Sequence, residues 1–383
     1  MLSEPVAAAG RPRGEVTLPE ALPEVLPDAL IAALRDPEAT RRFDARTWDR
    51  TLRQARVAGV TGALALRIEA LHPAPALPPA VRRALVSART LGAKIERDTR
   101  CELAVLRPLL AGLGVPVVLL KGAAYVARGL PAARGRIFGD IDLLVPRDAL
   151  EPVERVLLDA GWAYGPIAAY DAAYYRRWTH ELPPLEHPLR GTLIDVHHAI
   201  VQERTPSPAA RSQMIGEAVP LDAPFAVLQP ADMVLHAAVH LFNDGEFDRA
   251  LRDLLDVDSL VRTFRAEDAG FDRALAARAS AMGLAGQVAD ALHFARYLLG
   301  LDPGSDGIAG FVEQHRTRGL VERCFVQGFR PDHETARSFG KTPAHRLLYL
   351  RGHYLRMPLL PLSLHLLRKA LTGGLHAKGA SGP

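Results

Sequence analysis

Two aspartates separated by one residue, Asp140 and Asp142, interrupt an otherwise apolar stretch at residues 137–145. That stretch has the length and composition of a β-strand, on which residues two apart point to the same face. The two carboxylates are therefore expected side by side. Two carboxylates at such a short distance repel each other unless a cation neutralises them. A site with only oxygen ligands favours Mg²⁺ or Mn²⁺.

A third carboxylate, Asp195, lies in a second apolar, strand-like segment, GTLIDVHHAI. Three carboxylates on neighbouring strands are able to hold two metal ions, one activating an attacking oxygen and one bound to a triphosphate. Upstream, the strand-like run at residues 117–120 turns at Lys121 and Gly122 into a helix-compatible piece at residues 123–128. The free N–H groups and positive dipole end of such a helix suit phosphate oxygens. Together these features predict a phosphoryl or nucleotidyl transfer site.

On these residues the chain resembles the nucleotidyltransferases of the polymerase-β-like superfamily. It is most similar to a bacterial branch with a leucine-lysine-glycine turn followed by a DIDLLV-type strand. The superfamily pattern is a glycine and a small residue at the start of a helix, an acid-x-acid strand, and a third acid on a later strand. Here these positions read Gly122-Ala123, Asp140-Ile141-Asp142 and Asp195. The resemblance covers about residues 30–320, with the motifs concentrated between residues 117 and 198.

The resemblance implies an α+β fold, with a small mixed β-sheet nucleotidyltransferase core flanked by N-terminal and C-terminal helical subdomains. It implies transfer of an NMP from an NTP such as ATP to an acceptor, with release of pyrophosphate. Asp140, Asp142 and Asp195 would bind the metal ions as catalytic residues, and Asp195 would also be able to take the acceptor's proton.

The phosphate side of the expected site departs from the superfamily at one position. Gly-Gly or Gly-Ser is usual where this chain has Gly122 and Ala123, so a side-chain hydroxyl is missing. Backbone contacts and the charge of Lys121 would compensate. Because a triphosphate needs more positive charge than two metal ions supply, Arg136 is also expected to reach the phosphates, unless it is a solvated loop charge. His197 lies two residues after Asp195, on the same strand face, either towards the ligand or packed as a structural histidine.

Two other functions fit parts of the pattern. A metal-dependent sugar-nucleotide glycosyltransferase also binds a metal diphosphate at an acid-x-acid strand end, although the Lys-Gly turn and the third acid argue against it. A non-catalytic nucleotide-binding scaffold protein would fit the Gly122-Ala123 departure, whereas retention of three aspartates favours activity. The acceptor stays open between a small molecule, a lipid-linked sugar, RNA and a protein.

Composition places these motifs in an ordinary folded chain, with 48% hydrophobic and 23% charged residues. The net charge of +4 fits an anionic partner without selecting one. The two cysteines, Cys101 and Cys324, form no CxxC pattern, so a reducing cytoplasm is the expected location. We divide the chain into a disordered tail (1–25), an N-terminal helical subdomain (26–114), the nucleotidyltransferase core (115–222), a helical domain closing the cleft (223–330), and a basic amphipathic segment with its tail (331–383).

The helical parts carry further polar residues. Residues 81–113 read as one long amphipathic helix. A helix from Pro230 places Asp232, His236 and His240 near one face, for substrate contact or packing. A helix at residues 249–264 carries Asp253 and Asp256, for which a solvated face is expected.

Two further segments have open interpretations. Residues 168–188 are aromatic and contain arginines, as in a base-stacking loop or in an aromatic cluster that covers the sheet. Residues 344–371 combine leucines with Arg, His and Lys, which fits peripheral contact with an anionic membrane, docking on an acidic partner, or packing on the body.

Overall fold

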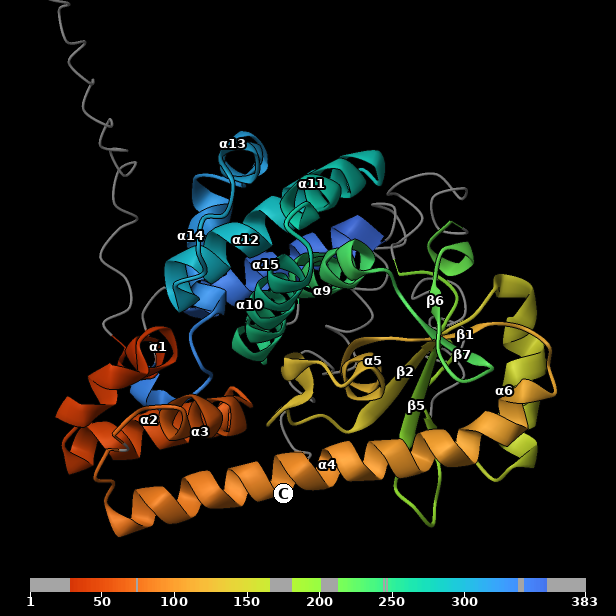
Figure 1. The fold of residues 1–383 in the computed structure, drawn as a ribbon, viewed down its shortest axis with the longest axis horizontal. Coiled ribbons are helices and arrows are strands. Elements are labelled where there is room, and N and C mark those ends of the chain that lie inside the picture. The colour runs from red at the N-terminus through yellow and green to blue at the C-terminus, as the bar shows by residue number, and fades with distance from the viewer. Residues whose placement is uncertain are drawn as a thin grey trace, which may run out of the picture.

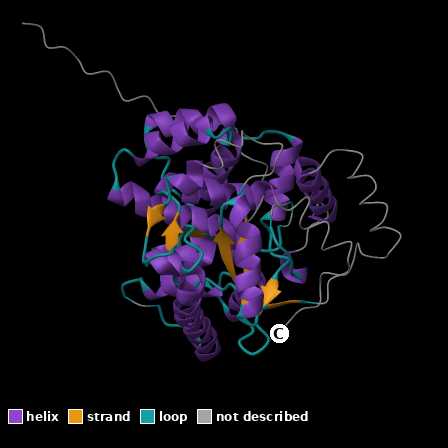
Figure 2. Cartoon of the chain, turned by 90° about the vertical axis from the view of Figure 1, so that its right-hand side faces the viewer, coloured by secondary structure: helices purple, strands orange, loops and turns teal. Residues whose placement is uncertain are grey.

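The computed structural model describes residues 28–73, 75–165, 181–200, 213–243, 245, 247–336 and 341–356. Within them, seven strands form one mixed sheet that helices surround (Figures 1 and 2). The predicted α+β fold with flanking helices is confirmed. The expected tail at residues 1–25 lies outside the described residues, as do most of the aromatic segment and the chain after residue 356.

The sheet places its longest strands at the centre. Its order is β3-β4-β5-β2-β1-β7-β6, and β2 runs parallel to β5 and antiparallel to β1. β1 and β7 are apolar and buried at every position, as expected for strands covered on both faces. The strands are β1 (Val117–Leu119), β2 (Asp140–Leu144), β3 (Ala163–Tyr164), β4 (Leu185–Glu186), β5 (Leu193–His197), β6 (Val219–Pro220) and β7 (Phe225–Val227).

The N-terminal helices lead to the sheet along one long helix. They are α1 (Ala29–Arg35), α2 (Ala45–Val57), α3 (Thr61–Glu69) and α4 (Pro79–Ala111). With 33 residues, α4 is about 50 Å long and runs beneath the whole molecule in Figure 1. One of its ends packs on α2 and α3, and the other packs on α5 (Lys121–Arg128) and α6 (Leu150–Asp159). The predicted long helix is confirmed.

Three glycines fasten the loop that precedes β2 to these helices. A Cβ on Gly62 of α3 would lie 2.2 Å from the carbonyl oxygen of Gly135, and one on Gly92 of α4 would lie 2.8 Å from the Cα of Gly135. Gly135 itself has a φ of +69°, which favours glycine. Backbone therefore packs directly on backbone, and this contact fixes the loop that leads to the acidic strand.

The C-terminal helices gather to the upper left of the sheet in Figure 1. Rings of Phe242, Phe294, Phe325 and Phe329 pack together in their interior. Among the described residues, no helix combines the length and the apolar composition that crossing a bilayer requires. The helices are α9 (Pro230–Asn243), α10 (Ala250–Glu267), α11 (Phe271–Ala281), α12 (Ala285–Leu299), α13 (Asp306–His315), α14 (Leu320–Gly328) and α15 (Lys341–Arg356).

One expectation for α10 is wrong. Asp253 and Asp256 do not lie on a solvated face, since their side chains are only 13% and 8% exposed. The helix packs against α9, α12 and the short 3-10 helix η2 (Pro131–Ala133), so several of its faces are covered. Both carboxylates are stabilised there by arginine partners instead of water.

Candidate functional site

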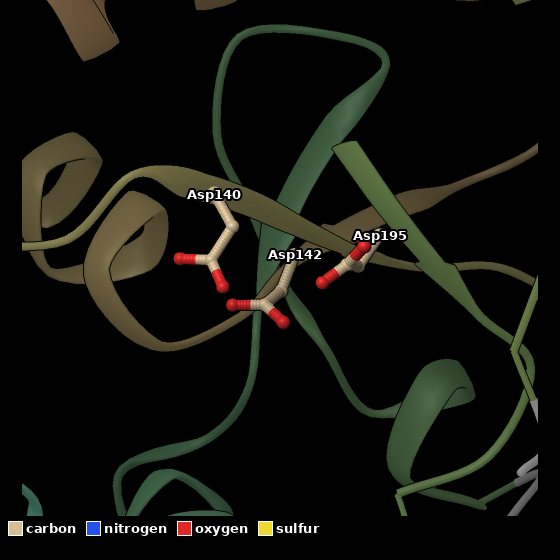
Figure 3. A group of neighbouring side chains, drawn as sticks. All are labelled: Asp140, Asp142 and Asp195. Atoms are coloured by element: carbon tan, nitrogen blue, oxygen red, sulfur yellow. The ribbon is translucent and has the colours of Figure 1, made fainter. Parts of the chain in front are cut away.

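The three aspartates converge on one point of the sheet (Figure 3). Asp140 and Asp142 share a face of β2, and in the parallel register of β2 and β5 Asp195 lies directly opposite Asp142. One carboxylate oxygen from each aspartate lies within 4.8 Å of the others. The arrangement that the sequence predicted for these side chains is therefore present.

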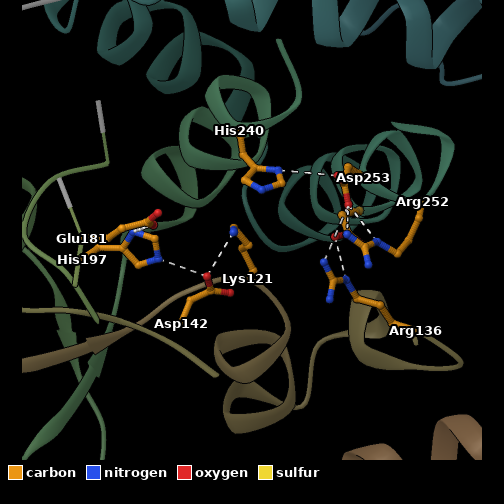
Figure 4. A network of polar contacts seen from close by, with 9 residues as sticks. Lys121, Arg136, Asp142, Glu181, His197, His240, Arg252 and Asp253 are labelled. Atoms are coloured by element: carbon orange, nitrogen blue, oxygen red, sulfur yellow. Dashed lines mark hydrogen bonds and ion pairs between the residues drawn. The ribbon is translucent and has the colours of Figure 1, made fainter. Parts of the chain in front are cut away.

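Asp142 is stabilised by two cationic partners (Figure 4). Its Oδ1 lies 3.1 Å from Lys121 Nζ and 3.2 Å from His197 Nε2. Burial alone would raise the pKa of Asp142, but Lys121 and His197 outweigh it and hold the pKa well below its ordinary value. His197 is itself oriented by Glu181, whose Oε2 lies 3.1 Å from His197 Nδ1. The Asp142 carboxylate is therefore favoured in its ionised form and held in a fixed orientation.

Asp195 has the opposite electrostatic environment. Burial, followed by the charge of Asp142, raises its pKa to about 7. Its Oδ1 is buried without a hydrogen-bond partner among the described residues. An unpartnered buried carboxylate oxygen beside two further carboxylates is costly unless a cation binds there. The three aspartates thus fit a divalent metal ion that prefers oxygen ligands.

The turn before α5 is strained and tightly packed. Lys121 has a φ of +42°, in the left-handed region, which costs a residue with a side chain on the order of 1–3 kcal/mol. A Cβ on Gly122 would lie 2.8 Å from the Phe138 ring, so only glycine fits. The first N–H with an acceptor inside the helix is that of Ala124, which donates to Leu120 O at 3.2 Å. Gly122 and the buried Ala123 therefore present backbone N–H groups at the helix start.

Arg136 is placed differently from the expectation. Its Nε lies 2.8 Å from Asp256 Oδ2, its Nη2 lies 3.8 Å from Asp253 Oδ1, and its guanidinium covers the Phe138 ring at 5.2 Å. Burial opposes its charge, but the two carboxylates outweigh burial and raise the pKa of Arg136. Its guanidinium is engaged in the interior beside the Gly122 turn, and contact between Arg136 and the phosphates stays a prediction.

The polar residues of α9 have different partners. Asp232 binds Arg278 at 2.7 Å, and His240 Nδ1 lies 3.5 Å from Asp253 Oδ2. His236 is buried, and burial followed by the charge of Lys121 holds its pKa well below its ordinary value. His236 is also within range of the charges of His240 and Asp142, so substrate contact by this face of α9 stays a prediction.

Glu181 was missed from the sequence. It precedes a short proline-containing stretch and forms an isolated β-bridge with His197. No periodic pattern in the sequence predicts such a bridge. The only signal was its position inside the aromatic segment at residues 168–188.

Comparison with known proteins gives one match. No curated protein and no solved structure matches the chain. A family model described as an uncharacterised nucleotidyltransferase matches residues 44–300, which is more than half of the chain. The matched region contains the three aspartates, the Lys121-Gly122 turn and the helices as far as α12. The resemblance found in the sequence is confirmed: the chain belongs to this uncharacterised family of nucleotidyltransferases, enzymes that transfer nucleotidyl groups.

Proposed function

We propose that the chain is a metal-dependent enzyme that moves an NMP from an NTP to an acceptor hydroxyl or phosphate and releases pyrophosphate. The observation that carries this proposal is the group of three carboxylate oxygens within 4.8 Å of one another, one of them buried and without a hydrogen bond. In a nucleotidyltransferase family, such a group is the expected place for Mg²⁺ or Mn²⁺.

The reaction is a substitution at the α-phosphorus. The acceptor oxygen forms a bond to that phosphorus, the bond to the bridging oxygen of pyrophosphate breaks, and the acceptor's proton passes to a base. Asp140, Asp142 and Asp195 would hold the metal ions, and Asp195 would be able to take the proton. Divalent cations bound there would neutralise phosphate charge and lower the pKa of the attacking hydroxyl.

The rest of the proposed site binds and orients the nucleotide. The backbone N–H groups of Gly122 and Ala123 would donate to phosphate oxygens, with Lys121 adding positive charge. Arg249, exposed at the start of α10 and attracted by Asp140, supplies further charge at the same side of the site. His197 keeps Asp142 in place, as its bond to Asp142 Oδ1 indicates.

Family membership weighs against the two alternative functions. The sugar-nucleotide glycosyltransferase remains as an outcome of the binding test below, and nucleotide binding without release of pyrophosphate would indicate a non-catalytic nucleotide-binding scaffold. The helical domain after residue 223 is expected to close the nucleotide cleft. Membrane contact by residues 331–383, a cytoplasmic location and the identity of the acceptor stay predictions.

Calorimetry with ATP, GTP, CTP and UTP tests the proposal, on the wild type and on the Asp140→Asn, Asp142→Asn double variant. We expect one nucleotide to bind in Mg²⁺, and binding to disappear in EDTA and in the double variant. Asp159→Asn, which neutralises an exposed carboxyl at the end of α6, is the matched control and should bind as the wild type does.

Other outcomes decide against the proposal. Binding of a nucleotide sugar but of no triphosphate would favour the glycosyltransferase. Metal-dependent binding that the double variant retains would place the nucleotide elsewhere on the chain.

A further inference from the structure

A cavity that the three aspartates do not line lies between α3, the loop at residues 131–136 and α10, and has a volume of about 280 Å³. Four arginines line it, Arg67, Arg134, Arg136 and Arg252, whereas Asp256 is the one carboxylate among its described lining residues. An arginine whose charge is not neutralised attracts anions in a concave site, and the planar guanidinium matches phosphate oxygens geometrically. The lining therefore has the chemistry of a phosphate site.

The arginines of this cavity differ in their partners. Three are paired: Arg67 with Asp258 at 2.9 Å, Arg136 with Asp256 at 2.8 Å and Arg252 with Asp253 at 2.7 Å. These pairs hold the guanidinium groups in fixed positions. Arg134 is exposed and pairs with no described side chain, so its charge is available to a ligand.

The backbone that carries Arg134 is held in place. The next residue, Gly135, packs against the backbone of Gly62 and Gly92, which leaves no room for a side chain at any of the three positions. A ligand therefore meets an arginine on an anchored loop, which reduces the entropy lost on binding.

Apolar side chains make up much of the remaining wall of the cavity, among them Val60, Leu66 and Leu255. The volume lies just below the roughly 300–1,000 Å³ of common small-molecule sites, so the ligand is small. A phosphate group on an arginine and a weakly polar body on the apolar side chains would fill this space.

We propose that this cavity binds a small phosphate monoester, with the phosphate on Arg134 and the organic part against the apolar wall. The site goes beyond the proposed reaction, since its occupation needs neither the aspartates nor a metal ion. Arg136 lies between the two sites: it lines the cavity, and its Nη1 would lie 2.9 Å from a Cβ on Gly122. One guanidinium thus separates the ligand from the turn expected to hold the donor phosphates.

Calorimetry with phenyl phosphate in EDTA, on the full chain, tests this site. We expect saturable binding to the wild type and equal binding to the Asp140→Asn, Asp142→Asn double variant. Arg134→Gln should weaken binding at least about tenfold, because a charge-assisted phosphate contact is lost. Arg83→Gln removes an exposed arginine of α4 outside the cavity and should change nothing.

Each other result overturns the proposal. No saturable binding to the wild type, unchanged binding to Arg134→Gln, or equal losses in Arg134→Gln and Arg83→Gln would exclude a specific site. Loss in the aspartate variant alone would place the ligand in the catalytic centre. Inorganic phosphate should bind about tenfold more weakly than phenyl phosphate, and equal affinities would exclude the apolar wall as part of the site.

Discussion

Replacing Asp195 by asparagine should stabilise the metal-free protein, by an amount that depends on pH. The pKa of Asp195 is about 7 in the folded chain and its ordinary value is 3.8. The folded state therefore keeps this proton to a higher pH than the unfolded state does. The stability associated with the protonated carboxyl is fully present below about pH 4 and is lost as pH rises through 7.

The size of the effect follows from the same shift. A difference of about 3 pKa units corresponds to about 4 kcal/mol above pH 7, and to about 2 kcal/mol at pH 5. The asparagine side chain carries no charge at either pH, so Asp195→Asn should gain about these amounts in free energy of unfolding.

Urea unfolding in EDTA at pH 5 and pH 8 measures the gain. Asp159→Asn, the same substitution at an exposed position, should stay within about 0.5 kcal/mol of the wild type at both pH values. A gain for Asp195→Asn that is equal at the two pH values, or a loss at pH 8, would refute the idea that crowded burial raises the proton affinity of Asp195.

Three further variants test the packing around the site, each by urea unfolding. Gly122→Ala should destabilise the fold by about 1–3 kcal/mol, because its Cβ would meet the Phe138 ring at 2.8 Å. Gly112→Ala, with no atom within 4 Å of the added Cβ, is its control, and an equal loss there would exclude the steric explanation. Arg136→Leu should cost about 3–5 kcal/mol, because Asp256 keeps a buried charge without its close partner. Adding Asp256→Leu should recover most of that loss, and a double variant as unstable as the single one would contradict the ion-pair account.

Local patterns were sufficient for part of the site. The alternation of a strand put Asp140 and Asp142 on one face, and the apolar run around Asp195 marked a second strand. The interpretation assumed that the two strands are neighbours, but the parallel register of β2 and β5 is a long-range contact that neither the residues nor the resemblance predicted.

The predictions that missed or misplaced residues have a common physical origin, namely contacts between segments that are distant in the sequence. Arg136 and Asp256 are 120 residues apart, so no local pattern could pair them. The helical period placed Asp253 and Asp256 towards water because the helices and loops that cover α10 are not visible in that stretch. Glu181 reaches His197 through a single isolated bridge, which has no periodicity at all.

The contact of Gly135 with Gly62 and Gly92 limits where the chain can be shortened. The loop that leads into the acidic strand rests on backbone contributed by α3 and α4, both of which precede the sheet in the sequence. A fragment beginning at Val115 would leave Gly135 facing water, and residue 135, with a φ of +69°, would have lost the surface that holds it. The helices before the sheet are thus part of the scaffold of the site, and a shortened enzyme has to keep them.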